Sequence, residues 1–302
     1  MHTNLILRAG TVRDIDSQVE KLLRDLGNPQ PPIRLEDVRK LLRLDLGYYS
    51  STNDSWLQQK IHQMRVAGKQ VVTQPSLILD VVRGLGLKGL LLPERRQVLL
   101  DEEFPKAKHR WNEAHEIAHD ILDWHKGLAH GDPEHTLSPT CQETTEAEAN
   151  YGAGRLLFAG QRFVDELRSA PLDLARIRSL HEPFGNSITS TLWRSVELSL
   201  TPACGFVSAH PGAALDTPEK DVRYFIRSPR FASEFAGVDC AAIWSFVKNY
   251  CRGGRGPLGF ASCRLHDLRG DPHEFHFETF YNGYDALTLG THVQGQTRVI
   301  TV

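Results

Sequence analysis

The residues best suited to chemistry in this sequence form the pattern His-Glu-x-x-His at positions 115–119. Residues four apart on a helix lie nearly above one another, so the imidazoles of His115 and His119 can bind one metal ion. Glu116 projects to the neighbouring edge of the same face, where a carboxylate can act as general base on a metal-bound water. The pattern predicts a hydrolytic zinc site. The alternative is a chance match on a surface helix.

A catalytic zinc usually has a third protein ligand. His125 lies six residues after His119, where one class of metallopeptidase carries its third histidine. That arrangement needs a glycine at position 122 to turn the chain sharply out of the helix, and this sequence has Leu122 there. We therefore expect the helix to continue past Leu122 and His125 to point away from the metal.

Acidic residues further along the chain are better candidates for the third ligand. They are Glu143, Glu146 and Glu148, in a segment whose small residues would let a second helix pack closely on the first. A glutamate on an antiparallel second helix would complete a His-His-Glu site with one open position. We choose Glu148, with Glu146 as the first alternative and Glu143 as the second. Acids that are not ligands would form a solvated helix N-terminus.

The elements that must position these residues follow from apolar spacing. We expect helices over residues 12–26, 35–44 and 108–124, a hairpin of strands at 85–92 and 97–100, a loop at 127–140, and a helix that begins at Thr144 or Thr145. Residues 161–200 read as helix, turn, helix, which fits either a DNA-reading helix-turn-helix or two packed helices. Strands are expected at 204–209, 259–265, 274–281 and 297–302, with a helix at 241–250. The predicted fold class is α+β, in three parts: residues 1–160, 161–200 and 201–302.

Composition indicates an ordinary globular protein. The 302 residues are 40% hydrophobic and 24% charged, with 35 Lys and Arg against 37 Asp and Glu. This near-neutral balance gives no argument for a nucleic-acid or membrane partner, and no apolar run approaches the ~20 residues that a bilayer requires. Five cysteines without a CxxC pair, and an N-terminus unlike a secretory signal, favour a cytoplasmic protein with reduced thiols.

In the order of its features the chain resembles the ImmA/IrrE zinc metallopeptidases. The resemblance covers about residues 10–200 and rests on His-Glu-x-x-His and on Glu-Ala-Asn-Tyr-Gly-Ala-Gly-Arg-Leu-Leu-Phe at 148–158, which is similar to the family's Glu-Ala-Asn/Asp-x-Phe-Ala-x-x-Leu-Leu. This chain has Tyr151-Gly152 near the place where Phe-Ala is usual, and no Met-Pro follows its Leu-Leu. The resemblance implies Zn²⁺ held by His115, His119 and Glu148, with Glu116 as the base.

The same resemblance implies an architecture and a biological role. The architecture is a mainly helical zincin-like domain with a small hairpin, a helix-turn-helix-like middle, and a GAF-like sensory C-terminal module. The role is cleavage of a helix-turn-helix repressor in response to a stress or DNA signal, which derepresses stress or defence genes. The subgroup most similar in this reading is the CapP type, whose peptidases are paired with repressors in anti-phage defence operons.

Peptide hydrolysis also needs a donor, besides zinc, for the developing oxyanion. The candidates are His125, His130, His135, Tyr151 and Arg155. Asp123, one turn beyond His119, is a candidate to orient a metal-binding imidazole through its other nitrogen. An ordinary surface role for Asp123 is an equal alternative.

Two further features suggest control of the site. Cys141 falls in the expected loop before Glu148, and its thiolate could occupy the open zinc position until a signal displaces it. The alternative is an ordinary loop cysteine. A basic, Gly-rich segment contains Arg252 and Arg255, with Phe260 soon after, and cations beside aromatic rings suit single-stranded DNA as an activating signal. A small-molecule pocket or a plain exposed loop would give the same pattern.

The competing function is a non-proteolytic protein. A zinc-stabilised sensor or DNA-binding regulator would use the middle helices, hold a structural metal, and have no need of Glu116. An open coordination position and a glutamate at the general-base position favour the enzyme.

Overall fold

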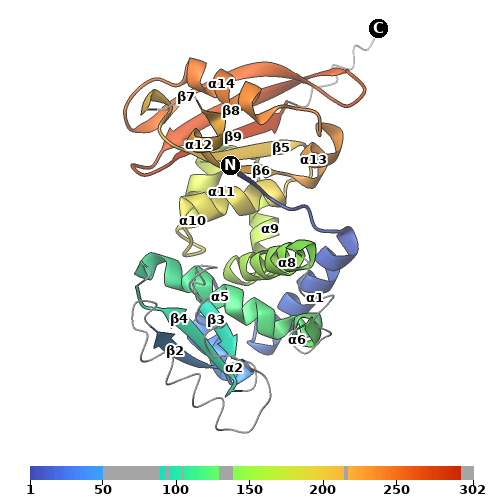
Figure 1. Cartoon of the computed structure of the whole chain (residues 1–302), viewed down its shortest axis with the longest axis vertical. Helices are drawn as coiled ribbons and strands as arrows, with labels where there is room; N and C mark the ends of the chain where they lie inside the picture. The colour runs from blue at the N-terminus through green and yellow to red at the C-terminus, as the bar shows by residue number, and fades with distance from the viewer. Residues whose placement is uncertain (50–88, 93–94, 104, 129–138, 214–216, 294–302) are drawn as a thin grey trace. The chain divides into compact units, whose positions relative to one another are not determined.

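The computed structural model describes residues 1–49, 89–92, 95–103, 105–128, 139–213 and 217–293 (Figure 1). They form an α+β protein, as predicted, that divides into two compact units. One unit is Leu7–Gly160, and the other combines Met1–Ile6 with Gln161–Val302. Residues 161–200 lie within the second of these units, together with residues 1–6.

Helices dominate the unit Leu7–Gly160. They are α1 (Ala9–Asp25), α2 (Leu35–Leu42), α5 (Lys106–Ile121), α6 (Asp123–Leu128) and α8 (Pro139–Leu157). The apolar spacing that predicts α1 is buried, with Ile15, Val19 and Leu22 at most 5% exposed. Gly27 follows the helix with a φ of +78°, a conformation that favours glycine and ends the helix there.

A three-stranded sheet supports these helices. The strands β2 (Asp45–Tyr49), β3 (Gly89–Leu92) and β4 (Gln97–Asp101) lie in the order β2-β4-β3. The antiparallel pairing of β3 with β4 confirms the predicted hairpin, whereas β2, which pairs parallel to β4, was not predicted. Val98 and Leu100 are fully buried, and α5 lies against both β3 and β4. The sheet thus fixes the helix that carries the two histidines.

Helix α8 packs against both α5 and α1, and the three helices lie side by side in Figure 1. On the α1 side, the guanidinium of Arg155 is 97% buried and pairs with Asp16 at 2.7 Å and Glu20 at 3.1 Å. A buried cation requires such partners, because leaving it unpaired would cost several kcal/mol. This contact sets the rotation of α8 about its axis.

The second unit contains a six-stranded sheet in the order β1-β6-β5-β9-β8-β7. Its strands are β1 (His2–Thr3), β5 (Ala203–Ser208), β6 (Val222–Arg227), β7 (Gly256–His266), β8 (Pro272–Tyr281) and β9 (Ala286–His292). The predicted strands at 204–209, 259–265 and 274–281 are confirmed, while β1, β6 and β9 were missed. The strand expected at 297–302 lies outside the described residues.

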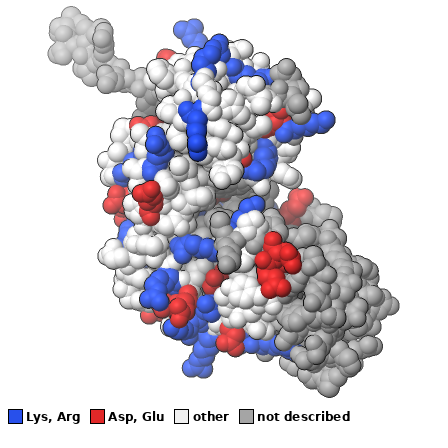
Figure 2. Space-filling model, turned by 90° about the vertical axis from the view of Figure 1, so that its left-hand side faces the viewer, with Lys and Arg blue, Asp and Glu red and all other residues white. Residues whose placement is uncertain are grey.

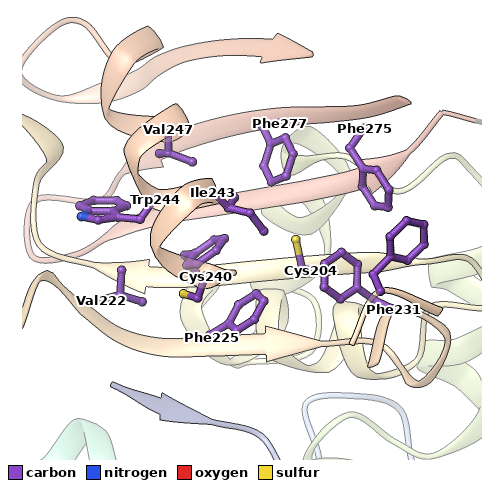
Figure 3. Packing of buried hydrophobic residues seen from close by; sticks show 12 residues of the cluster. Cys204, Val222, Phe225, Phe231, Cys240, Ile243, Trp244, Val247, Phe275 and Phe277 are labelled. Carbon is purple, nitrogen blue, oxygen red and sulfur yellow. The ribbon is translucent and has the colours of Figure 1, made fainter. Parts of the chain in front are cut away.

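Helices cover both faces of this sheet. On one face lie α13 (Pro229–Glu234) and α14 (Cys240–Tyr250), and their core, which includes Trp244, Phe275 and Phe277, is drawn in Figure 3. The short helices η2 (Pro211–Ala213) and α12 (Pro218–Asp221) adjoin α14. On the other face, α10 (Leu174–His181) and α11 (Ile188–Glu197) pack against β5, β6 and β9, and α9 (Gln161–Arg168) precedes them.

The packing of α10 and α11 on the sheet agrees with the second of the two readings of residues 161–200, two packed helices. Leu192 and Val196 of α11 are fully buried against Val207 and Leu289 of the sheet. No residue of α11 is exposed.

Among the described residues, no helix combines the length and apolarity needed to cross a bilayer.

Candidate metal centre

Helix α5 brings the two predicted histidines together. No Gly or Pro interrupts Lys106–Ile121, and Pro105 stands just before the first turn, where proline is tolerated. The buried side of the helix carries Ala114, Ile117 and Ala118, all 0% exposed. One turn apart on another side, the Nε2 atoms of His115 and His119 are 3.2 Å from each other. The expected placement of both imidazoles is confirmed.

Glu146 of α8 completes a group of three. Its Oε2 lies 3.2 Å from Nε2 of His115, and its Oε1 lies 3.7 Å from Nε2 of His119. A tetrahedral ion with ligand bonds of about 2.1 Å separates neighbouring donor atoms by about 3.4 Å, so these spacings fit a zinc-sized ion. These three residues could hold a metal ion. Glu146 is 51% exposed, which leaves the group open to solvent.

Glu148, the ligand chosen from the sequence, lies elsewhere. Its Oε2 accepts a hydrogen bond from Nε1 of Trp124 at 2.7 Å and lies 2.9 Å from Nε2 of His125. Residues two apart on a helix point about 200° away from each other. Because α8 turns Glu146 toward α5, Glu148 must face α6 instead. The second alternative, Glu143, is exposed in an earlier turn of α8.

The sequence argument about His125 also needs correction. Helix α5 ends at Ile121, and Leu122 adopts an extended conformation with φ −88° and ψ 94°. The chain re-enters a helix at once as α6, which returns His125 to the site. Nδ1 of His125 lies 2.9 Å from Nδ1 of His119. His125 is outside the three-ligand group, as expected, but it touches that group rather than pointing away.

Asn150 is a site residue that the sequence analysis missed. Its Oδ1 lies 3.1 Å from Nδ1 of His115, so it can accept the proton of that ring and leave Nε2 free for a metal. Asn150 is four residues after Glu146 on α8 and therefore shares its face. The spacing Glu-x-x-x-Asn on a helix following His-Glu-x-x-His was the available signal.

Electrostatics around the group suit metal binding. Burial, with the nearby His115 and His125, lowers the pKa of His119 to about 3, so this ring is neutral and can offer a lone pair. Burial also lowers the pKa of His115, but Glu146 and Glu116 outweigh it and raise that pKa overall. The hydrogen bond from His115 lowers the pKa of Glu146. A metal ion would displace the proton that these two residues share.

Glu116 occupies the position expected of the base. It is 92% buried beside His115, and burial raises its pKa to about 7, with the Glu146 carboxylate adding to the effect. His115 and a backbone hydrogen bond from Leu91 of β3 act in the opposite direction. A general base works best when its pKa lies near the working pH.

In the metal-free protein this pKa predicts a pH-dependent stability. The folded state keeps a proton on Glu116 that the unfolded chain releases near its ordinary pKa of 4.5, so stability falls as the pH rises from there to about 7. The loss amounts to about 3 kcal/mol. Glu116→Gln removes this slope. Urea unfolding with a chelator present measures the free energy of unfolding of both proteins. The difference, variant minus wild type, should increase by about 3 kcal/mol between about pH 4 and about pH 8. Parallel pH profiles would contradict the burial of the carboxyl.

In the described part of the chain, the structure does not place the other candidates for oxyanion donor or orienting residue at the metal group. The hydroxyl of Tyr151 donates to Asp16 of α1 at 3.3 Å, and Arg155 is buried against the same helix, so neither faces the metal group. Asp123 is exposed at the start of α6, and Nδ1 of His119 lies 2.9 Å from Nδ1 of His125. The other two candidates, His130 and His135, lie outside the described residues.

Cys141 lies on a helix and not in a loop. Helix α8 begins at Pro139, before the predicted cap at Thr144 or Thr145, so the backbone of Cys141 is already helical. Its side chain is outside the described part of the chain. Cys141 precedes Glu146 by five residues on the same helix.

Close packing of α5 on α8 depends on Gly152. A Cβ atom at this position would lie 3.2 Å from Cβ of Ala118, which is tighter than ordinary van der Waals contact. This confirms the prediction that small residues allow the two helices to approach. The approach is what brings Glu146 to the two histidines.

We therefore expect Gly152→Val to weaken metal binding by about 10-fold or more and to destabilise the fold by about 1–3 kcal/mol, because the added atoms push α8 away from α5. Metal affinity by chelator competition and urea unfolding measure the two effects. Gly10→Val is the matched control, since Gly10 lies in α1 with nothing within 4 Å of its Cβ position. A Gly152→Val protein with unchanged metal affinity would contradict the packing argument.

In the second unit, the predicted nucleic-acid residues lie on the surface. Arg252 and Arg255 are exposed in the turn before β7, and Phe260 of β7 is 72% exposed. On the face drawn in Figure 2, basic and acidic side chains are interspersed over the described residues rather than gathered by sign. The exposure agrees with a binding loop or with a plain surface loop equally.

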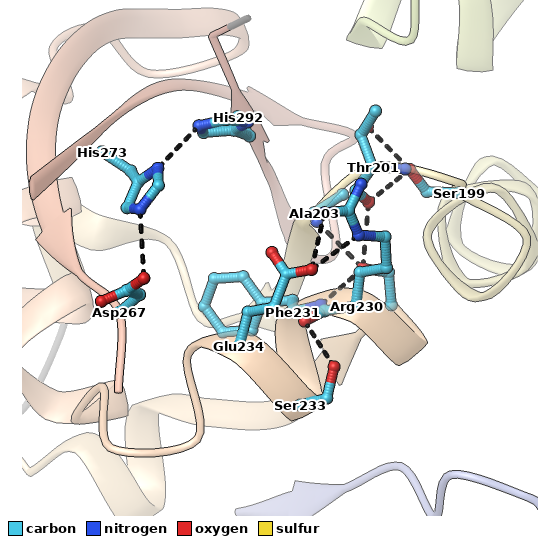
Figure 4. Close-up of polar contacts among 11 residues, drawn as sticks. Ser199, Thr201, Ala203, Arg230, Phe231, Ser233, Glu234, Asp267, His273 and His292 are labelled. Carbon is cyan, nitrogen blue, oxygen red and sulfur yellow. Dashed lines mark hydrogen bonds and ion pairs between the residues drawn. The ribbon is translucent and has the colours of Figure 1, made fainter. Parts of the chain in front are cut away.

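Figure 4 shows a second histidine cluster in that unit. His273 lies between two partners, with Nδ1 3.2 Å from Nε2 of His292 and Nε2 3.4 Å from Oδ2 of Asp267. The three side chains form a row and do not converge on one point. Within the described residues, the converging group is therefore the one on α5 and α8.

Comparison with known proteins adds little to this geometry. No family model matches the chain, and no curated protein matches it. A solved structure of a Mycobacterium tuberculosis transcriptional regulator is similar with a TM-score of 0.48 at 13% sequence identity, covering 93% of this chain and 88% of that chain. A similarity of this size supports no conclusion about function.

Proposed function

We propose that this protein is a zinc-dependent endopeptidase. The observation that carries the proposal is the convergence of His115, His119 and Glu146, with Glu116 buried next to them. Three protein ligands leave one position of a tetrahedral ion for water, which distinguishes catalytic zinc from the four-ligand structural type. Glu146 is 51% exposed, so this ligand is accessible to solvent.

The chain's own residues have separate tasks in this proposal. Bound zinc would lower the pKa of a water molecule and polarise the peptide carbonyl. Glu116 takes the proton from the attacking water and passes it to the leaving amine, for which a pKa near neutrality is suited. Asn150 accepts a hydrogen bond from Nδ1 of His115, which would leave Nε2 of that ring free to bind zinc.

A peptide substrate suits the surroundings of Glu116. Among the described strands, β3 is at an edge of its sheet, and the backbone of Leu91 in this strand hydrogen-bonds to Glu116. An extended peptide can add to such an edge through main-chain hydrogen bonds. A scissile bond carried along β3 would thereby arrive beside the base.

The proposed substrate and the identity of the two units follow from the resemblance to ImmA/IrrE peptidases, whereas the proposed control follows from particular residues of this chain. The proposed substrate is a helix-turn-helix repressor, the unit Leu7–Gly160 is the zincin-like part, and the second unit is a GAF-like sensor. Single-stranded DNA at Arg252 and Arg255 is the proposed signal, and Cys141 the proposed inhibitory ligand. Both arginines are exposed, which this signal requires.

The test is cleavage of a defined protein. Zinc-loaded protein is incubated with helix-turn-helix repressors, including any that is encoded next to its own gene, with and without single-stranded DNA, and new N-termini are identified by mass spectrometry. We expect cleavage at one position that stops with a chelator and resumes when zinc is restored. The proposed peptidase activity would be refuted if the zinc-loaded protein cleaved neither the repressors in any condition nor a library of unfolded peptides.

A further inference from the structure

A chain of contacts leads from the metal group to a carboxylate that does not belong to it. Nδ1 of His119 lies 2.9 Å from Nδ1 of His125, and Nε2 of His125 lies 2.9 Å from Oε2 of Glu148. The side chain of His125 is 97% buried and that of Glu148 is 88% buried. Trp124 adds a third contact, donating its indole N–H to the same Oε2 at 2.7 Å.

The hydrogen bonds in this chain can run in only one direction when a metal is bound. An imidazole that gives the lone pair of Nε2 to a metal carries its proton on Nδ1, so His119 must donate to Nδ1 of His125. His125, accepting at Nδ1, carries its own proton on Nε2 and donates it to Glu148. The indole N–H is a donor only, which requires Oε2 of Glu148 to be an acceptor. One carboxylate therefore sets the tautomer of both rings.

We infer that His125 and Glu148 are positioning residues that orient His119 and fix its tautomer for metal binding. Ligand histidines generally donate their second N–H to an oxygen acceptor. Here a second imidazole is inserted between the ligand and the carboxylate. The inference deepens the proposed metal site, and so rests on it, but it does not require that the bound metal hydrolyse peptides.

The two ligand histidines are held differently. His115 donates to Asn150, a neutral amide, whereas His119 is connected through His125 to an anion. An anionic acceptor strengthens a hydrogen bond and makes the ligand ring more basic. We therefore expect metal binding by His119 to depend more on its hydrogen-bond partner than metal binding by His115 does. The break at Leu122 and the start of α6 after it bring His125 back to His119.

The first test uses the wild-type protein, so that folding of a variant is not in question. Two-bond proton–nitrogen NMR correlations of the zinc-loaded, ¹⁵N-histidine-labelled protein report which ring nitrogen carries each proton. We expect His119 with its proton on Nδ1 and His125 with its proton on Nε2. A proton on Nδ1 of His125, or on both of its nitrogens, would overturn the inference.

The second test measures the affinity for Co²⁺ by chelator competition, together with the Co²⁺ absorption spectrum. His125→Leu and Glu148→Ala should each bind one equivalent about 10- to 100-fold more weakly than the wild type, with altered absorption bands. His125→Asn should recover most of the affinity, because its amide oxygen can accept from Nδ1 of His119. Glu148→Gln should recover part, because it keeps an acceptor but loses the charge.

The control is Glu143→Ala, which removes an exposed acid from the same helix and should leave affinity and spectrum unchanged. Folded His125→Leu protein that binds Co²⁺ as tightly as the wild type would overturn the inference, as would His125→Asn protein no better than His125→Leu. Failure of the proposed peptidase appears separately, as intact Co²⁺ binding without cleavage.

Discussion

Glu116→Gln should remove peptide-bond hydrolysis while the protein still binds its metal. The amide has nearly the shape of the carboxyl but cannot take a proton from water, and a positioned general base contributes about 10²–10⁴ to the rate. Because Gln has nearly the same shape as Glu, the side chains that pack around position 116 should keep their places in the variant. The measurement is the rate of substrate cleavage by zinc-loaded variant and wild type, with bound zinc determined on the same samples.

The same variant separates the enzyme from its competitor. If the metal were purely structural, as in a sensor or DNA-bound regulator, any cleavage attributed to this protein would be independent of Glu116. Equal cleavage by the zinc-loaded Glu116→Gln protein would therefore contradict the role assigned to this residue. Loss of zinc along with activity would instead point to a ligand or folding role for Glu116.

Glu146→Gln should abolish tight metal binding. Removing one of three protein ligands costs more than losing a group that only supports a ligand, which is itself worth about 10- to 100-fold in affinity. We therefore expect the affinity for zinc to fall by more than about 100-fold in chelator competition. The half-exposed setting of Glu146 makes an effect on folding small, because the side chain is not part of the core.

Glu148→Gln is the matched control, two residues away on the same helix. It should retain one equivalent of bound metal, with an affinity lowered only to the extent that His125 loses its anionic partner. The reverse result, in which Glu148→Gln protein has no metal site and Glu146→Gln protein keeps one, would restore the ligand chosen from the sequence.

The choice between these two glutamates shows where sequence reasoning stops. Helical geometry requires that Glu146 and Glu148 face different sides, but it does not say which side faces α5. Periodicity gives no help here, because every residue from 151 to 157 is buried and α8 has no single apolar stripe. The rotation of α8 is set by tertiary contacts such as Arg155 with α1 and Gly152 with α5.

The first two ligands were predictable because their geometry is local. His115 and His119 depend only on the helix that joins them, and the uninterrupted run through residues 106–121 made that helix clear. His125 depends on a break at Leu122 that no Gly or Pro announces. An expectation based on glycine as the only means of turning the chain therefore failed at this point.

Burial patterns account for only some of the strands that were predicted from the sequence. Strand β8 alternates buried and half-buried positions, β7 mostly alternates half-buried and exposed ones, and both were found by their pattern. Strand β9 is buried on both faces over its first five residues and carries no alternation, and β5, buried at all six positions, was predicted without one. The pairing of β2 with β4 joins segments far apart in the chain, and such a pairing cannot be predicted from the local sequence of either strand.

The metal group itself can be tested most directly by X-ray diffraction from zinc-loaded crystals at energies on either side of the zinc absorption edge. We expect one anomalous peak, with Nε2 of His115, Nε2 of His119 and a carboxylate oxygen of Glu146 each within about 2.0–2.2 Å of it. A peak held by other residues, or crystals of folded protein with no peak at α5 and α8, would contradict the metal centre on which the proposed function depends.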